Sequence, residues 1–139
     1  MKNPTIFLGV EMMDRDHLRI EQIFAAAAGA RDDALPALYA EAMRELAEHF
    51  AREEDFMREI DFPGLHCHVA QHAVLIGEMK RAGAVLSGDP ARRRIGTIVP
   101  ALVLSHVATM DRMVAAFLRG ELATADFDGL RLPTPATAA

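Results

Sequence analysis

The sequence lacks several features that would fix a protein's class at once. Its 139 residues include no tryptophan, one tyrosine and one cysteine, and aromatic residues make up only 6% of the chain. With so few large rings, aliphatic, Met, Ala and Phe side chains must fill the core. The single Cys67 excludes an internal disulfide, and we expect it to be a small reduced hydrophobe in a cytoplasmic protein.

Long apolar runs are missing as well. The N-terminal stretch MKNPTIFLGVEMMD contains only a short apolar run, from Ile6 to Val10, so we expect no secretory signal. No window approaches the roughly 20 continuous apolar residues that a membrane span needs. These absences predict a soluble cytoplasmic protein with no membrane partner.

Positive charge is scarce too, with 15 Lys and Arg against 20 Asp and Glu and a net charge of -5. Phosphate binding needs clustered Lys and Arg, so we expect no nucleic-acid partner. The one basic run, residues 91–94, is assigned to a solvated face. The length predicts a single domain, and 51% apolar with 25% charged residues is ordinary globular composition.

Four stretches have helical periodicity and are separated by short breaks. They run from Asp14 or Asp16 to about Ala30, from about Ala34 to Ile60, from Leu65 to Leu86, and from Pro90 to near Gly120. We expect one of the two N-terminal aspartates to cap the first helix and Asp89 to cap the fourth. No strand alternation competes, so the sequence predicts an all-α protein.

The short connections predict an antiparallel, up-down-up-down four-helix bundle with an N-terminal arm, over residues 1–120. Residues 121–139 are rich in Ala, Thr, Pro and Gly, and we expect a partly disordered C-terminal tail. Leu130 and Leu132 in this tail are candidates for covering one end of the bundle.

Polar residues interrupt the apolar stripes of all four helices. Residues four apart on a helix face nearly the same way, so His68 pairs with His72 and His49 pairs with Glu53. His66 is two residues from His68 and faces away. The apolar stripes of the first and fourth helices each contain one more histidine, namely His17 and His106. Five of the six histidines are therefore predicted to point into the bundle.

Each of these residues alone favours an ordinary role, such as a hydrogen-bonded core histidine or an exposed side-chain pair. Together they do not, because burying five imidazoles and a carboxylate without partners would cost several kcal/mol. Divalent transition metals would satisfy them. Five histidines exceed the four ligands of one zinc, so two metals are the economical hypothesis.

A second carboxylate, Asp111, fits this hypothesis only with a local change in the helix. It lies five residues after His106, which is about 140° around an ideal α-helix. For both side chains to reach one centre the fourth helix must widen, as it does in a single-turn π-bulge. The spacing therefore predicts a π-type irregularity between His106 and Asp111.

The fragments MDRDH, HFAREEDFM, HVAQH and HVATMD occur in order at helix-length separations between Val10 and Leu118. In this combination the sequence resembles the hemerythrin family. The resemblance implies two non-haem iron ions bridged by an oxo or hydroxo group. The implied metal ligands are His17, His49, Glu53, His68, His72, His106 and Asp111.

The resemblance also implies how the ligands are shared. One iron would take His68, His72 and His106, and the other would take His17 and His49, with both carboxylates bridging. The iron with two histidines would keep an open position, where dioxygen binds reversibly in such proteins. Glu54 is interpreted as the solvent-facing neighbour of Glu53, and Asp14 either orients His17 or caps its helix.

Apolar residues near the ligands in the sequence are candidates for the lining of the site: Leu46, Phe50, Phe56, Val103 and Val107. An apolar lining would withhold the protons that turn bound dioxygen toward oxidation chemistry. We therefore expect an oxygen-binding metalloprotein that stores, delivers or scavenges dioxygen and is not primarily an enzyme, with weak oxidase or peroxidase activity at most. The oligomeric state is left open.

Other functions remain open at this point. The protein could sense oxygen, redox state or iron through a partner, or act as a di-iron enzyme on peroxide, nitric oxide or an organic substrate. It could also simply hold iron, or use zinc to stabilise its fold. His66 is expected to lie exposed near a helix start, and the role of Cys67 is open.

Overall fold

The protein folds as four packed helices in a computed structural model that describes residues 5–84 and 88–130. The first three are α1 (Glu11–Ala28), α2 (Leu35–Glu59) and α3 (Leu65–Ala82). The fourth is continuous over Gly88–Leu118. It consists of α4 (Gly88–Arg93), the π-turn η1 (Arg94–Ile98), α5 (Val99–His106), the π-turn η2 (Val107–Asp111) and α6 (Arg112–Leu118). No strand occurs in the described residues, so the predicted fold class is confirmed.

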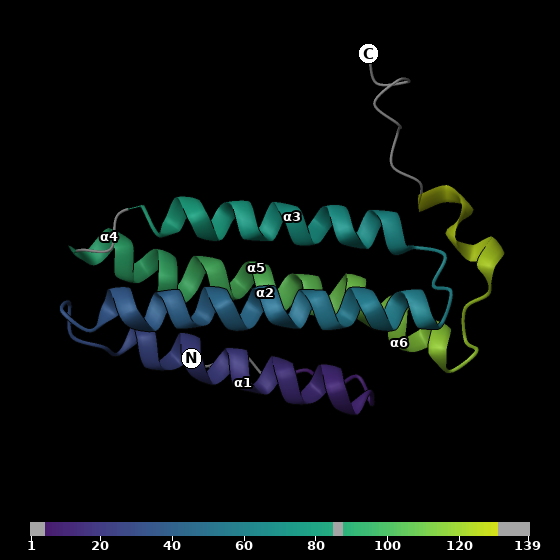
Figure 1. Ribbon diagram of the computed structural model, residues 1–139, viewed down its shortest axis with the longest axis horizontal. Helices are drawn as coiled ribbons and strands as arrows, with labels where there is room; N and C mark the ends of the chain where they lie inside the picture. The colour runs from purple at the N-terminus through teal and green to yellow at the C-terminus, as the bar shows by residue number, and fades with distance from the viewer. Residues whose placement is uncertain (1–4, 85–87, 131–139) are drawn as a thin grey trace, which may run out of the picture.

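The helices run lengthwise side by side (Figure 1) and contact one another in a ring. Helix α1 packs on α2, α2 on α3 and α3 on α5, and η1 returns to pack on α1. Two apolar clusters fill the interior. One includes Ile20, Phe50 and Leu75, and the other includes Met13 and Met57. The predicted ligands lie where these two clusters meet, so the polar residues occupy the middle of the bundle.

The start of α1 differs from the prediction. The helix begins at Glu11, after Val10, so neither aspartate caps it. The Asp14 carboxylate instead accepts hydrogen bonds from the backbone N–H groups of Leu8, at 2.7 Å, and Gly9, at 3.0 Å. Asp14 therefore fixes the N-terminal arm against the first turn of the helix.

The fourth helix has unpredicted features at both ends. It begins at Gly88, so Asp89 lies inside its first turn and is not the cap. It ends at Leu118, and Gly120 follows with a φ of 77°, a left-handed conformation that suits glycine. The expected end of α3 at Leu86 falls outside the described residues.

The first part of the C-terminal segment is ordered. A 3-10 helix, η3, spans Thr124–Leu130 and buries the Phe127 ring. This ring lies edge-on to Phe62, with centroids 5.0 Å apart, and edge-on to Phe117 at 6.0 Å. Phe127 therefore covers one end of the bundle. The side chain of Leu130 and all of Leu132 lie outside the described residues.

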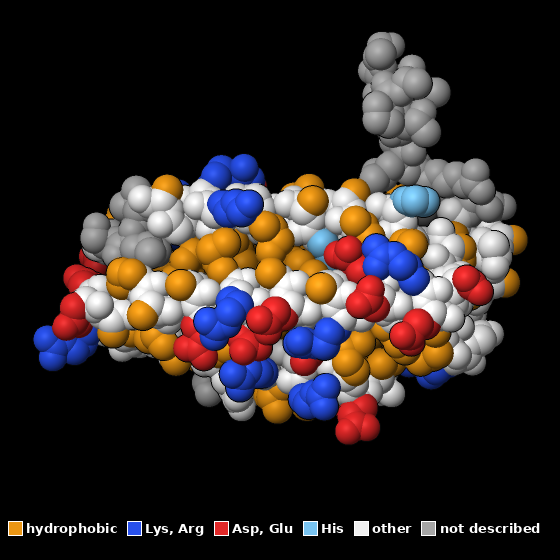
Figure 2. Space-filling model, in the orientation of Figure 1, with side chains coloured by type: hydrophobic (Ala, Val, Ile, Leu, Met, Phe, Trp, Pro, Cys, Tyr) orange, Lys and Arg blue, Asp and Glu red, His pale blue; other side chains and the backbone are white. Residues whose placement is uncertain are grey.

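The fourth helix is long and apolar. Among the described residues, Gly88–Leu118 is the one helix long and apolar enough to cross a membrane, with a mean hydropathy of 1.4. Length and composition alone are weak evidence, because the core helix of a bundle passes the same test. This helix also carries two buried polar residues, His106 and Asp111. On the opposite side of the bundle, Figure 2 shows charges of both signs intermixed along α2.

Candidate metal centre

The structure brings all seven predicted ligands together in the middle of the bundle. His17 comes from α1, two residues each come from α2 and α3, His106 ends α5 and Asp111 ends η2. Each of these side chains is at least about nine-tenths buried, from 0% exposed for Glu53 to 9% for His17. His66 is exposed, as predicted. That the seven bind metal remains a prediction.

The seven side chains form two groups that share both carboxylates. One group is His68, His72 and His106 with Glu53 and Asp111, and the other is His17 and His49 with the same two carboxylates. Within each group the possible ligand atoms lie within 4.8 Å of one another. We call these groups the three-histidine side and the two-histidine side.

Each carboxylate divides its two oxygens between the two sides. Asp111 places Oδ1 2.9 Å from Nε2 of both His68 and His106, and places Oδ2 3.0 Å from Nε2 of His17. Glu53 does the same. Its Oε1 is 3.1 Å from His72 Nε2, and its Oε2 is 2.9 Å from His49 Nε2. A carboxylate that presents one oxygen to each side has the arrangement of a bridge between two cations.

The spacing of these atoms fits metal ligands as well as hydrogen bonds. Two atoms bound at right angles to one metal, each about 2.1 Å from it, lie about 3.0 Å apart. Within the described residues, several of the buried atoms have no hydrogen-bond partner despite these short approaches. They include Nε2 of His68 and His106 and both carboxylate oxygens of Asp111. Buried polar atoms without partners are costly, and cations at the two points of convergence would satisfy them.

The electrostatics of the cluster also call for positive charge. Burial opposes charge on the Asp111 carboxyl, and so does Glu53 beside it, but the surrounding imidazoles outweigh both and lower its pKa to about 2. The pKa of Glu53 is also well below its usual range, because its neighbouring imidazoles outweigh the effect of burial. Burial likewise disfavours charged histidine, yet the nearby carboxylates raise the pKa of His49 and of His106 to about 9. The carboxylates thus stay ionised and require cations, either protons on the histidines or metal ions.

A buried aspartate that was expected only as a helix cap orients one ligand on the two-histidine side. Nδ1 of His49 lies 2.9 Å from the Asp16 carboxylate, which also accepts a hydrogen bond from Arg52 at 2.9 Å. These partners outweigh burial and lower the pKa of Asp16 to about 2. A carboxylate on Nδ1 leaves Nε2 of the same ring for a metal. Asp16 therefore has the orienting role considered for Asp14.

Glu54 orients a ligand on the three-histidine side and does not simply face solvent. Its Oε2 lies 2.8 Å from Nδ1 of His72, although the glutamate side chain is 21% exposed. The spacing from His49 gave the direction of Glu54 on its own helix correctly. It gave no information about α3, which packs along that flank. Sequence reasoning missed the contact because it joins two helices.

Aromatic rings pack closely on the three-histidine side. Phe50 stacks on His72, with ring centroids 3.8 Å apart and an interplanar angle of 7°. Phe62 lies edge-on to His68 at 6.3 Å. Of the predicted lining residues, Phe50 therefore contacts a ligand ring directly, while Leu46 belongs to the core cluster beside the site and Phe56 to the cluster beyond it. Val103 and Val107 border a pocket described below.

The predicted irregularity of the fourth helix is confirmed. Residues Val107–Asp111 form the π-turn η2, directly after His106. The wider turn compensates for the five-residue spacing, because His106 and Asp111 approach to 2.9 Å. The other π-turn, η1, was not predicted. Leu102 is 37% exposed, although the sequence placed it inside.

Comparison with known proteins agrees with this geometry. The model of the hemerythrin HHE cation binding domain matches residues 8–118. The chain belongs to the hemerythrin family. It is also 36% identical over 118 residues to a bacteriohemerythrin of Ralstonia nicotianae, covering 81% of this chain and 84% of that protein. No solved structure matches it. The buried cluster of histidines and carboxylates is thus the cation site of a hemerythrin-like domain.

Proposed function

We propose that the cluster holds two iron ions and that the protein binds dioxygen reversibly. The observation that supports this most directly is the division of the carboxylate oxygens. Glu53 and Asp111 each present one oxygen to a group of three imidazoles and the other to a group of two. Such a pair of bridges accommodates two cations of unequal coordination, one with more protein ligands than the other.

The donor set suits iron in its reduced state. Five neutral imidazoles and two carboxylates contribute only two negative charges, fewer than the Glu-rich sites of ferritin-like di-iron proteins. A less anionic ligand set favours the lower oxidation state. Two ferrous ions would supply the electrons that hold dioxygen and would recover them when it leaves.

The residues around the cluster support binding without turnover. Phe50 and Phe62 cover the imidazoles of the three-histidine side and exclude water from them. Asp16 and Glu54 hold His49 and His72 in fixed orientations through Nδ1. The Nδ1 atoms of the other three histidines have no hydrogen-bond partner among the described residues. The buried cluster therefore offers few groups that could pass a proton to a bound ligand, which favours release of dioxygen unchanged.

A single experiment tests the proposal. The protein is reduced without air, its metal content per chain is measured, and oxygen is then admitted while the visible spectrum is followed. Two irons per chain, with an absorption band that appears with oxygen and disappears when oxygen is removed, are expected. Irreversible oxidation with steady oxygen consumption would favour an enzyme. One zinc per chain, with no iron, would contradict the proposal.

A further inference from the structure

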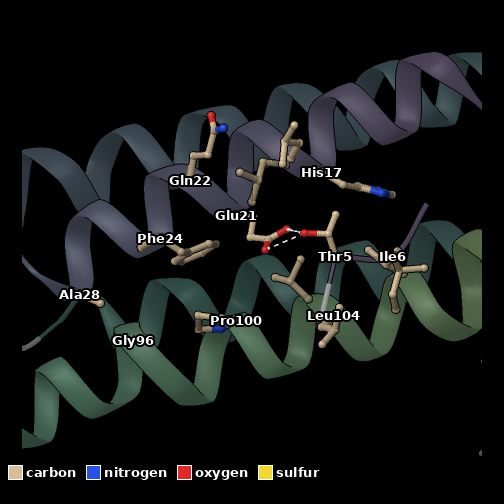
Figure 3. Close-up of a pocket in the computed structure, with 15 residues that line it drawn as sticks. Thr5, Ile6, His17, Glu21, Gln22, Phe24, Ala28, Gly96, Pro100 and Leu104 are labelled. Carbon is tan, nitrogen blue, oxygen red and sulfur yellow. Dashed lines mark hydrogen bonds between the residues drawn. The ribbon is translucent and has the colours of Figure 1, made fainter. Parts of the chain in front are cut away.

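A cavity of about 610 Å³ lies between α1 and α5, beside the metal cluster. Figure 3 shows it between the two helices, with Thr5 and Ile6 of the N-terminal arm on one flank. Its volume falls in the range of sites that admit small organic molecules, and it far exceeds the space that one water-sized molecule occupies. The cavity is therefore large enough to hold a diatomic molecule.

The cavity reaches the metal cluster on one side only. Of the seven predicted ligands, His17 alone lines it, and the three-histidine side contributes none. Val103 and Val107, which precede and follow His106 in the helix, form part of the wall. The cavity thus leads to the two-histidine side, the side with fewer protein ligands.

The wall of the cavity is mostly apolar and includes Ile20, Phe24 and Leu104. It also contains one polar contact. The Thr5 hydroxyl lies 3.0 Å from both oxygens of the exposed Glu21 carboxylate and donates to it (Figure 3). Glu21 is the one acidic residue among the described lining residues, and no Lys or Arg is among them.

We propose that this cavity is the passage by which small uncharged molecules reach the metal pair. Its latch is the hydrogen bond from Thr5 to Glu21, which restricts entry. Its charge filter is the Glu21 carboxylate, which repels anions. The proposal rests on the proposed function, because it assumes a metal pair that takes a ligand on the two-histidine side. An anion entering the cavity would meet the Glu21 carboxylate and then lose its water against apolar walls. A neutral diatomic molecule meets neither penalty.

Association rates of one anion and one neutral ligand test the passage. Azide is mixed rapidly with the oxidised protein, and nitric oxide is mixed without air with the reduced protein, after iron has been counted for every variant. Leu104→Trp narrows the cavity, and we expect both association rates to fall about tenfold, because the indole must move aside for each entry. The matched control is Leu102→Trp, two residues away on the same helix and outside the cavity lining, which should leave both rates unchanged.

Two further variants separate the latch from the filter. Thr5→Val keeps the shape of the side chain but removes the hydroxyl, and it should raise both rates by about two- to fivefold. Glu21→Gln can still accept the Thr5 hydrogen bond but has no charge. It should raise the azide rate about threefold at low salt, lose that gain at high salt, and leave the nitric oxide rate unchanged. Glu59→Gln, at an exposed position on α2 outside the lining, is the charge control.

Xenon provides a measurement that does not need iron. Under xenon pressure, amide resonances of Ala25 and Val103 in the metal-free protein should shift, and the shifts should disappear in Leu104→Trp, while that of the distant Val74 stays unchanged. The passage would be overturned if Leu104→Trp had the same azide association rate and the same nitric oxide association rate as the wild type. An absence of xenon shifts would overturn it as well. A protein that meets the rate predictions but shows no reversible oxygen band would lose the proposed function and keep the passage.

Discussion

The two sides of the metal cluster differ in what surrounds them. On the three-histidine side the imidazoles are at most 3% exposed, and the Phe50 and Phe62 rings pack against all three of them. On the two-histidine side His17 is 9% exposed and borders a large cavity. Close packing fixes ligands, and an adjoining cavity admits molecules. If the proposed function holds, metal retention and ligand access fall on opposite sides of one pair of carboxylates.

The largest effect is expected from removing a ligand on the closely packed side. His72→Ala deletes one imidazole of three and one of the close contacts of the Glu53 Oε1 atom, so metal content should fall by about half or more. Metal per chain, measured by elemental analysis, checks this. His66→Ala on the exposed face of the same helix is the control. Equal loss of metal from both variants would contradict the assignment of faces.

The pH dependence of stability should distinguish the metal-free from the metal-loaded protein. In the metal-free protein the pKa of His49 and of His106 is about 9, above the ordinary value of about 6.5. Their protonated forms therefore add stability that is fully present below about pH 6.5 and is lost as the pH rises through 9. We expect the free energy of unfolding to fall by a few kcal/mol over this window.

Metal ions replace those protons, so the metal-loaded protein should not show the same loss. Urea unfolding at pH 6 and pH 9.5 measures the free energy of unfolding of the metal-free and the metal-loaded protein. The apparent metal affinity should also rise with pH up to about 9, since fewer protons must be displaced. Stability of the metal-free protein that rises over the same window would refute the assigned directions of the shifts.

The orienting carboxylates should show a smaller effect that differs between the sides. Asp16→Asn removes the buried negative charge that faces His49. Glu54→Gln removes the partly exposed negative charge that faces His72. Loss of such a partner typically lowers metal affinity about 10- to 100-fold. We expect Asp16→Asn near the upper end of that range and Glu54→Gln near the lower end, measured by competition with a chelator. Asp14→Asn, which contacts the arm and no ligand, should not change the affinity.

The smallest effect is expected from the ring that covers the three-histidine side. Phe50→Leu removes the stacked contact with His72 and part of the buried apolar area, so the free energy of unfolding should fall by about 1 to 2 kcal/mol. Thermal unfolding of the metal-loaded protein measures this change. Phe7→Leu, at a ring that is 68% exposed, should leave the free energy of unfolding unchanged. If Phe50→Leu does not change the free energy of unfolding, the stacking on His72 contributes little to stability.

Features set by local spacing could be predicted from the sequence. Helical periodicity placed five histidines inside the bundle and His66 outside, and the structure agrees. The five-residue interval after His106 predicted η2, because a regular helix cannot bring Asp111 back to the same face. The helix starts were less predictable. Asp14 bonds to the arm that precedes its helix and Asp16 to another helix, so neither acts as the expected cap.

Contacts between helices could not be predicted in this way. The pairing of Asp16 with His49 spans 33 residues and that of Glu54 with His72 spans 18. Each depends on the rotation of two helices about their axes and on their separation, which periodicity along a single helix leaves undetermined. The Phe127 ring at the end of the bundle is similar, since its partners lie on other elements.

The sequence by itself determined which side chains face the interior, in what order they occur, and where one helix must widen, because these follow from 3.6 residues per turn. Only the tertiary structure decided how the two carboxylates divide their oxygens, which residues orient His49 and His72, and which side of the cluster meets a cavity. Those features arise where separate helices meet, and their geometry is fixed by packing.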